Sequence, residues 1–156
     1  MVVVADTSPI NYLFLIAQID LLARLYARIL IPPALLAELK HPLAPKPVRD
    51  WASKAPAWLE VLSPKESLIL AALDLGESEA IALATEVHAE VVLIDEQAGR
   101  QEAVRRGLRV AGTLSVLDEA DRTGLVVFDD AITQLHKTTF RVSQAFLSEI
   151  RQKRSG

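Results

Sequence analysis

Two short apolar segments of this sequence each end in an aspartate, and this repetition constrains the fold more than any other feature. Residues 2–5 (Val-Val-Val-Ala) precede Asp6, and residues 91–94 (Val-Val-Leu-Ile) precede Asp95. Such continuous apolar runs are typical of strands buried on both faces of a parallel sheet. Ligands of these sheets bind beyond the carboxyl ends of the strands. We therefore expect Asp6 and Asp95 to share an acidic site, which a divalent cation with oxygen ligands would neutralise.

The rest of the chain alternates between strand and helix patterns. Further strands are expected over 29–31, 59–62 and 109–111. Helices are expected over 8–17, 20–25, 33–39, 48–55, 63–73, 77–88, 96–106, 113–122, 130–135 and 143–153. Strands separated by helices require right-handed crossovers. The expected fold class is therefore α/β, a three-layer α/β/α sandwich around a mostly parallel sheet of four to five strands.

Length and composition narrow the protein class. The 156 residues predict one domain over 1–156, with a helical C-terminal extension at about 128–156. The chain has no cysteine, which excludes disulfides and thiolate zinc sites. No basic segment precedes the first strand, and no apolar run approaches about 20 residues, so we expect a cytoplasmic protein without a membrane span. The mean hydropathy of +0.25 suggests an exposed apolar face and a homodimer, formed by helices near 21–29 and 35–39.

Positive charge is concentrated near the C-terminus. Residues 131–156 contain five basic residues against the single acid Glu149, whereas the whole chain has a net charge of −3. One interpretation is that this segment contacts phosphates. The other is that its last helix packs through Phe140, Phe146, Leu147 and Ile150 and leaves the charges in water.

The acidic residues at strand ends have structural and functional interpretations. Ser8, directly before Pro9, is expected to cap the first helix, which leaves Asp6 without a capping task. A buried carboxylate without a structural task is costly, so Asp6 is expected to be functional. Asp95 could instead cap the helix that follows it.

Acidic residues on the predicted helices are less decisive. Glu38 lies between apolar neighbours, and it occupies either an exposed edge or an inward-facing position. Glu77 and Glu79 lie in a first helical turn, where acids favour the helix dipole, and Asp74 with Glu77 fits a capping arrangement.

Several blocks of the sequence, taken in order, resemble the PIN-domain ribonucleases. These blocks are Asp-Thr-Ser-Pro after the first strand, residues 31–39 (Ile-Pro-Pro-Ala-Leu-Leu-Ala-Glu-Leu), residues 76–84 (Gly-Glu-Ser-Glu-Ala-Ile-Ala-Leu-Ala) and Leu-Ile-Asp at 93–95. The resemblance covers residues 2 to about 120 and is strongest to a prokaryotic, VapC-like subgroup. Many relatives are toxins of toxin–antitoxin pairs.

The resemblance implies a function and a set of site residues. It implies a metal-dependent endoribonuclease that cleaves single-stranded RNA with Mg²⁺ or Mn²⁺, and a small antitoxin protein as partner. It assigns the metal and the catalysis to Asp6, Glu38, Glu79 and Asp95, with Ser8 as a helper. Together with the charge pattern, it suggests RNA contacts for Arg100, Arg105, Arg106, Arg151, Lys153 and Arg154.

Two other functions fit parts of the pattern. A PIN-like fold with an acidic pocket could be a non-catalytic module that binds nucleic acid or protein. Phosphoryl transfer through Asp6 as nucleophile is the weaker alternative, because Ser8 stands where a second acid is usual. A nucleotide-cofactor enzyme is not expected, since the chain has no glycine-rich phosphate loop.

Overall fold

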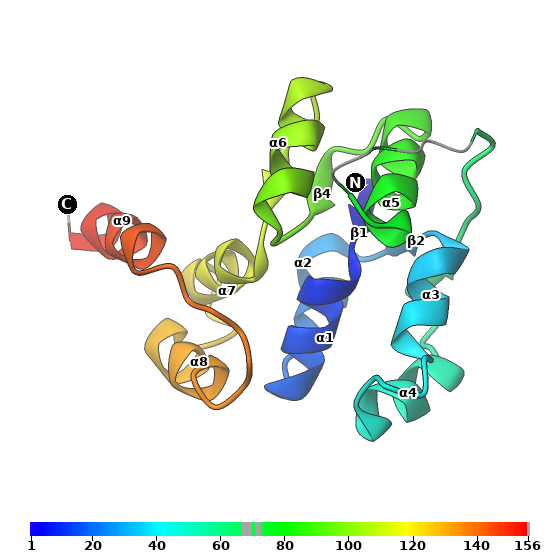
Figure 1. Cartoon of the computed structure of the whole chain (residues 1–156). Coiled ribbons are helices and arrows are strands. Elements are labelled where there is room, and N and C mark those ends of the chain that lie inside the picture. The colour runs from blue at the N-terminus through cyan, green and yellow to red at the C-terminus, as the bar shows by residue number, and fades with distance from the viewer. Residues whose placement is uncertain (67–69, 71–72, 156) are drawn as a thin grey trace.

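A parallel five-stranded sheet forms the centre of the protein (Figure 1). The computed structural model describes residues 1–66, 70 and 73–155. The sheet has the order β3-β2-β1-β4-β5, and all four pairings are parallel. Its strands are β1 (Val3–Ala5), β2 (Ile29–Ile31), β3 (Leu59–Val61), β4 (Val91–Leu93) and β5 (Val110–Ala111). The expected α/β fold class is confirmed.

The strand order fixes where the two strand-end aspartates lie. The chain begins in the middle of the sheet at β1, extends outward through β2 and β3, and returns to the other side of β1 with β4. Val3 pairs with Ile29 on one side and with Val91 on the other. Crevices form where strand order reverses, so the carboxyl ends of β1 and β4 mark the position for a site.

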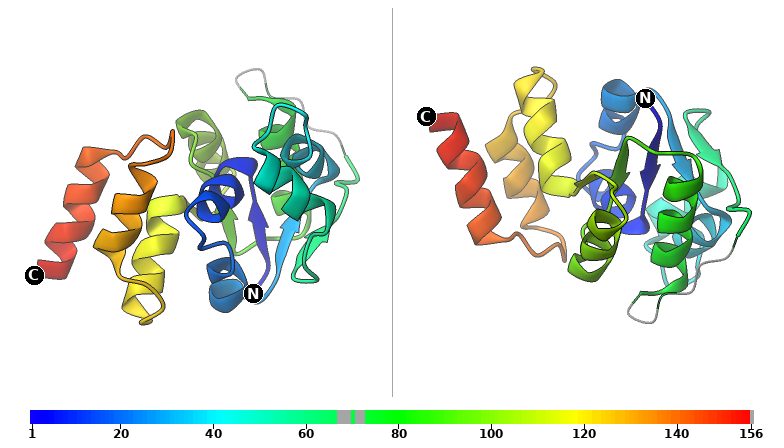
Figure 2. Two further views of the ribbon diagram at one scale, coloured as in Figure 1. Left: turned by 90° about the horizontal axis from the view of Figure 1, so that it is seen from below. Right: turned by 90° about the horizontal axis from the view of Figure 1, so that it is seen from above.

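Helices cover both faces of the sheet (Figure 2). On one face of the sheet, α2 contacts β2, α7 contacts β5, and α1 packs against α7. On the other face, α5 packs on β1 and β4, and α6 packs on β5. The helix α3 contacts both α1 and α5, and α4 packs on α1 and α3. Their bounds are α1 (Thr7–Leu15), α2 (Leu21–Tyr26), α3 (Pro33–Leu39), α4 (Lys46–Ser53), α5 (Leu75–Glu86), α6 (Gln97–Arg105), α7 (Thr113–Arg122), α8 (Phe128–Leu135) and α9 (Gln144–Ser155).

The last three helices extend away from the sheet. Figure 2 shows α7, α8 and α9 in succession, with α9 farthest from the strands. Leu147 and Ile150 of α9 are buried, so this helix packs by its apolar side. None of the helices in the described part of the chain is long and apolar enough to cross a membrane.

Several expected helix boundaries are wrong. The first helix begins at Thr7, so Asp6 and not Ser8 occupies the cap position, and Pro9 fits within the first turn. Gly76 lies inside α5 instead of ending a helix. The helix expected over 63–73 falls partly on residues 67–69 and 71–72, which lie outside the described residues, and residues 63–66 are not helical.

The helix faces predicted to form a homodimer lie in the core. Leu21, Leu22, Leu35 and Leu39 are all buried within the chain. The prediction of an interface at these residues is therefore wrong, because the sheet and neighbouring helices already cover them. Dimerisation itself stays a prediction.

Candidate acidic site at the carboxyl edge of the sheet

Asp6 is a buried carboxylate at the end of the central strand. Its side chain is 5% exposed, and its backbone N–H donates to the Leu93 carbonyl at 2.8 Å. Burial raises the pKa of Asp6 to about 7; the Thr7 backbone amide lowers it, and the charge of Asp74 raises it further. The charges of Glu38 and Asp95 act in the same direction. Three other carboxylates are therefore close enough to repel a charge on Asp6.

Glu38 comes to the same edge from α3. Thr7 Oγ1, in the first turn of α1, donates to Glu38 Oε2 at 2.7 Å. Burial raises the pKa of Glu38, the Thr7 hydroxyl lowers it, and Asp74 raises it. A Cβ at Gly76 would lie 2.3 Å from Glu38 Oε1, so glycine in the first turn of α5 makes room for this carboxylate. Glu38 thus connects α1, α3 and α5.

Asp95 follows β4 and is anchored to the start of α7. The Thr113 backbone N–H and its Oγ1 each donate to one carboxylate oxygen of Asp95, both at 2.7 Å. A Cβ at Gly112 would lie 2.6 Å from Asp95 Oδ1. Asp95 therefore does serve a helix N-terminus, but of α7 and not of the helix that follows it.

Glu77 is a carboxylate of the site that the sequence interpretation missed. It is 7% exposed, and its Oε2 is buried without a hydrogen-bond partner among the described residues. The pKa of Glu77 is raised to about 8, first by burial and then by a hydrogen bond to Asp74 and the charges of Asp74 and Asp6. The same Oε2 lies against α6, where a Cβ at Gly99 would approach it to 2.9 Å.

A sequence signal for Glu77 did exist. Residues 80–84 of α5 are all buried, so this helix has little water-facing surface. An acid in its first turn is then forced toward neighbouring elements. Asp74, the cap of α5, accepts a hydrogen bond from the Glu77 backbone N–H at 2.8 Å, so the expected capping arrangement is confirmed.

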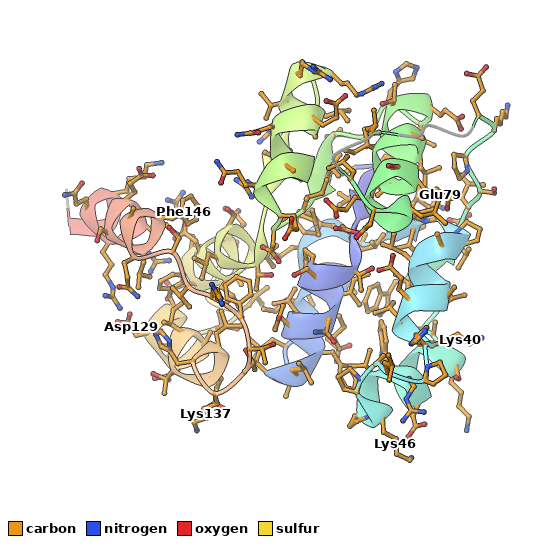
Figure 3. The ribbon with its side chains drawn as sticks, in the orientation of Figure 1. Lys40, Lys46, Glu79, Asp129, Lys137 and Phe146 are labelled. Atoms are coloured by element: carbon orange, nitrogen blue, oxygen red, sulfur yellow. The ribbon has the colours of Figure 1, made fainter. Side chains whose placement is uncertain are left out.

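Glu79 has a different position on α5. It is half-buried, and Figure 3 shows it on the side of α5 that faces away from α6. Among the described residues, the groups that mainly shift the pKa values of Asp6, Glu38 and Glu77 do not include Glu79. Its assignment as a metal ligand stays a prediction.

The site has donors suited to a divalent cation, although they are not gathered at one point. In the described part of the chain, no three acidic or histidine side chains lie close enough together to hold one metal ion. The donor set is nevertheless all oxygen, which hard divalent cations prefer. Glu77 Oε2 is a buried oxygen that has no hydrogen-bond partner among the described residues. A bound ion would therefore require the carboxylates to move toward one another.

An open cleft of about 640 Å³ lies beside Asp95. Ser8, the predicted helper, lines it from α1, and Arg100 lines it from α6. Arg100 donates to the Ile94 carbonyl at 3.0 Å. Residues 139–141, 143 and 146, from the segment after α8 and the start of α9, also line the cleft.

Most of the cations predicted to bind RNA are engaged elsewhere. Both Arg105 and Arg106 form ion pairs with Glu102. Arg151 pairs with Asp129, and Arg154 pairs with Asp118 and Asp121. Of the six predicted residues, Arg100 is the one that lines the cleft beside Asp95.

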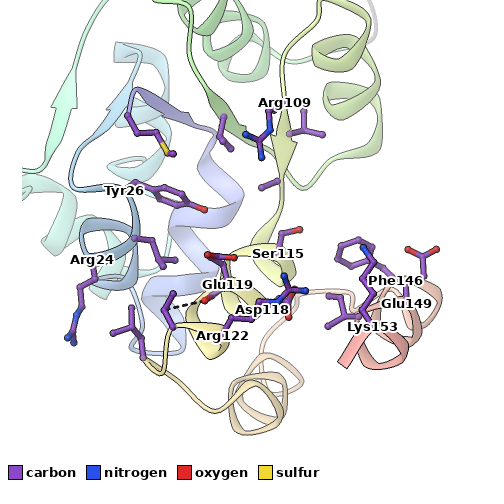
Figure 4. A pocket seen from close by; sticks show the side chains of 18 residues that line it. Arg24, Tyr26, Arg109, Ser115, Asp118, Glu119, Arg122, Phe146, Glu149 and Lys153 are labelled. Carbon is purple, nitrogen blue, oxygen red and sulfur yellow. Dashed lines mark hydrogen bonds and ion pairs between the residues drawn. The ribbon is translucent and has the colours of Figure 1, made fainter. Parts of the chain in front are cut away.

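A larger cavity, of about 900 Å³, lies at the other end of the sheet (Figure 4). Met1, Val91 and Val110, near the amino ends of three strands, line it together with α7 and α9. Lys153 projects from α9 at its rim, so this predicted RNA contact lies at the end of the sheet opposite to the acidic site.

The protein is therefore an α/β domain whose parallel sheet has an acidic site, with buried carboxylates, at its carboxyl edge. A family model described as PIN domain matches residues 2–155, and the chain belongs to the PIN-domain family. Proteins of this family are commonly nucleases that use divalent metal ions.

Comparison with solved structures gives a more distant likeness. The chain is similar to a PilT N-terminus domain protein from the hyperthermophilic archaeon Sulfolobus solfataricus, with 12% sequence identity and a TM-score of 0.48. The similarity covers 92% of this chain and 100% of that one. A comparison with curated proteins gave no match.

Proposed function

We propose that this protein is an endoribonuclease that hydrolyses single-stranded RNA with Mg²⁺ or Mn²⁺. The observation that carries the proposal is the group of carboxylates at the edge of the sheet, of which Asp6 and Glu77 are buried. Glu77 Oε2 has no hydrogen-bond partner in the described part of the chain, and burial raises the pKa of Asp6 to about 7. Asp6, Glu38 and Asp95 would hold the ion with a fourth carboxylate. When bound, the ion would supply charge neutralisation at the scissile phosphate and a water of lowered pKa.

The protein's own residues would position the substrate. Ser8 lines the cleft next to Asp95, and its hydroxyl would donate to a phosphate oxygen. Arg100, fixed by its bond to the Ile94 carbonyl, supplies positive charge at the same place. Thr113 keeps Asp95 in its orientation through two hydrogen bonds.

The cleavage experiment uses the full chain and a labelled single-stranded RNA with Mn²⁺. We expect cleavage by the wild type, none with EDTA, and at least a roughly hundredfold loss of rate in Asp6→Asn, as for removal of a principal charge-stabilising group. Circular dichroism should show that Asp6→Asn stays folded. If this variant cleaves RNA at the wild-type rate, Asp6 is not part of the catalytic site.

The fourth carboxylate is either Glu77 or Glu79, and a matched pair of variants separates them. We propose Glu77, because it is buried and interacts with Asp74 and Asp6, whereas the family resemblance implies Glu79. Calorimetric titration with Mn²⁺ should show weaker binding for Glu77→Gln and wild-type binding for Glu79→Gln. The reverse result would assign the ligand to Glu79.

A non-catalytic nucleic-acid- or protein-binding module is the alternative function. It is favoured by the separation of the carboxylates, since no three of them among the described residues could hold one ion as they stand. RNA binding without cleavage at any Mg²⁺ or Mn²⁺ concentration would support this alternative.

A toxin role in the cytoplasm, with a small antitoxin as partner, is a further part of the proposal. Its support is the resemblance to VapC-like proteins. Expression of the wild type in a bacterial host should then arrest growth, and Asp6→Asn should not. Equal growth of both strains at equal protein levels would contradict this role.

A further inference from the structure

The segment that joins α8 to α9 returns to the acidic edge from the far end of the molecule. The hydroxyls of Tyr12 and Thr139 are 2.8 Å apart, although the two residues are separated by 127 positions. The rings of Tyr12 and Phe140 pack edge to face, with centroids 5.0 Å apart. Because Tyr12 belongs to α1, which begins next to Asp6, these contacts hold the segment beside the site.

This segment forms one wall of the cleft that contains Asp95. Residues 139–141 and 143 line the cleft together with Ser8 and Arg100, and Phe146 adds an aromatic ring to that of Phe140. A volume of about 640 Å³ is in the range of pockets for a small organic ligand. A cleft of this size suits a nucleotide or two of a single strand.

The chemistry of the lining fits an unpaired nucleic acid strand. Arg141 is exposed and forms no ion pair with any residue that the structure describes. Arg100 uses one nitrogen for the Ile94 carbonyl and keeps other N–H donors. Grooves that bind single strands combine cations for the backbone with aromatic rings on which bases stack. Both features are present here, next to a carboxylate of the site.

We propose that residues 139–143 form the wall of a cleft for single-stranded RNA, with Arg141 and Arg100 contacting phosphates and Phe140 contacting a base. This proposal rests on the proposed ribonuclease function. It makes the segment after α8 part of the substrate site, positioned there by Tyr12. Among the described residues, Arg141 forms no ion pair, whereas Arg151 and Arg154, further along the chain, do.

The test measures binding separately from cleavage. Fluorescence anisotropy of a labelled single-stranded RNA is followed with the full chain in EDTA, so that no metal-dependent reaction takes place. For Arg141→Gln we expect severalfold weaker binding, and a slope of log affinity against log salt reduced by about 0.7, the value for one phosphate contact with a single strand.

Lys137→Gln is the matched control. It removes the same charge from an exposed residue four positions earlier, which Figure 3 places at the tip of the molecule beside α8. Its affinity and salt slope should equal those of the wild type. A duplex RNA of the same sequence should bind more weakly and without dependence on Arg141.

A second variant tests the contact that positions the wall. Tyr12→Phe removes the hydroxyl bonded to Thr139 and keeps the ring against Phe140. We expect weaker RNA binding at an unchanged melting temperature. Wild-type affinity in this variant would overturn the role of Tyr12.

Several results would overturn the cleft proposal. They are wild-type affinity and slope in Arg141→Gln, duplex binding as tight as single-strand binding, no RNA binding by the wild type, or Arg141-dependent binding of an acidic peptide but not of RNA. Failure of the ribonuclease function looks different. If the ribonuclease function fails, RNA binds through Arg141 but is not cleaved with Mn²⁺. If the cleft proposal alone fails, the protein cleaves RNA, and Arg141→Gln binds RNA as tightly as the wild type does.

Discussion

Two groups of acidic residues in this molecule have opposite surroundings. Among α7, α8 and α9, the acids Asp118, Asp121 and Asp129 are paired with arginines. Arg154 lies 2.5 Å from an Asp118 oxygen and 2.9 Å from an Asp121 oxygen, and its guanidinium stacks 4.8 Å from the centre of the Phe128 ring. A hydrogen bond from the Phe128 backbone and the Arg154 guanidinium lower the pKa of Asp121.

At the carboxyl edge of the sheet, acids face one another. Asp6 is repelled by Asp74, Glu38 and Asp95, and burial raises its pKa to about 7. Glu77 keeps a buried oxygen without a partner in the part of the chain that the structure describes.

The difference shows what each group does. Paired acids fasten the terminal helices to α7, whereas the acids at the sheet edge destabilise the fold when charged. A carboxylate cluster that is kept despite this cost is typical of functional sites. An acidic residue is therefore structural where it pairs with an arginine, as among α7, α8 and α9. It is a candidate metal ligand where it faces other acids, as at the carboxyl edge of the sheet.

The largest expected effect is stabilisation by metal. If the edge carboxylates bind Mn²⁺, a concentration of about 100 times Kd should add about 2.7 kcal/mol to the free energy of unfolding. For a chain of this length, the melting temperature should rise by roughly 5–10 °C. Asp6→Asn should abolish the rise, and Asp121→Asn should keep it. An equal rise in both variants would break the distinction between the two acidic groups.

The second effect is a loss of stability of the metal-free protein as pH rises. Asp6 and Glu77 titrate at about 7 and 8 in the folded protein, above their ordinary values of 3.8 and 4.5. Between pH 4 and 8 the folded state therefore holds more protons than the unfolded state, so the free energy of unfolding falls with rising pH.

Thermal melts in EDTA at pH 5 and pH 8 measure this effect. We expect a decrease for the wild type, and a smaller decrease for Asp6→Asn. Asp121→Asn should leave the decrease unchanged, because the lowered pKa of Asp121 affects stability only at acid pH. If the free energy of unfolding of the wild type were equal at pH 5 and pH 8, the edge carboxylates would not repel one another.

The sequence predicts this site only in part, and the reason is physical. Asp6 and Asp95 follow buried strands, so local hydrophobicity places them at one edge. Glu77 could not be placed in this way, because its direction depends on how α5 packs against Gly99 of α6. The contact between Tyr12 and the segment after α8 joins distant parts of the chain, and no local pattern encodes it.

A smaller effect is expected from breaking the paired group. Arg154→Met keeps the apolar stem on Phe128 and removes the charge between Asp118 and Asp121. Because Arg154 is partly exposed, we expect a loss of about 1 kcal/mol and a melting temperature lower by roughly 2–4 °C. Lys153→Met serves as the control without a measurable change. Equal melting temperatures for the two variants would show that pairing does not fasten α9.

The smallest effect should come from cations that already have partners. Arg105 and Arg106 were predicted to contact RNA, but both pair with Glu102 on the surface of α6. A paired cation releases fewer counterions when a phosphate approaches, so Arg105→Gln with Arg106→Gln should lower the salt slope of RNA binding by less than Arg141→Gln alone. Anisotropy titrations of the double variant at two salt concentrations provide the measurement. A decrease of about 1.4, twice the value for one phosphate contact, would mean that RNA displaces Glu102 and that both arginines belong to the RNA-binding surface.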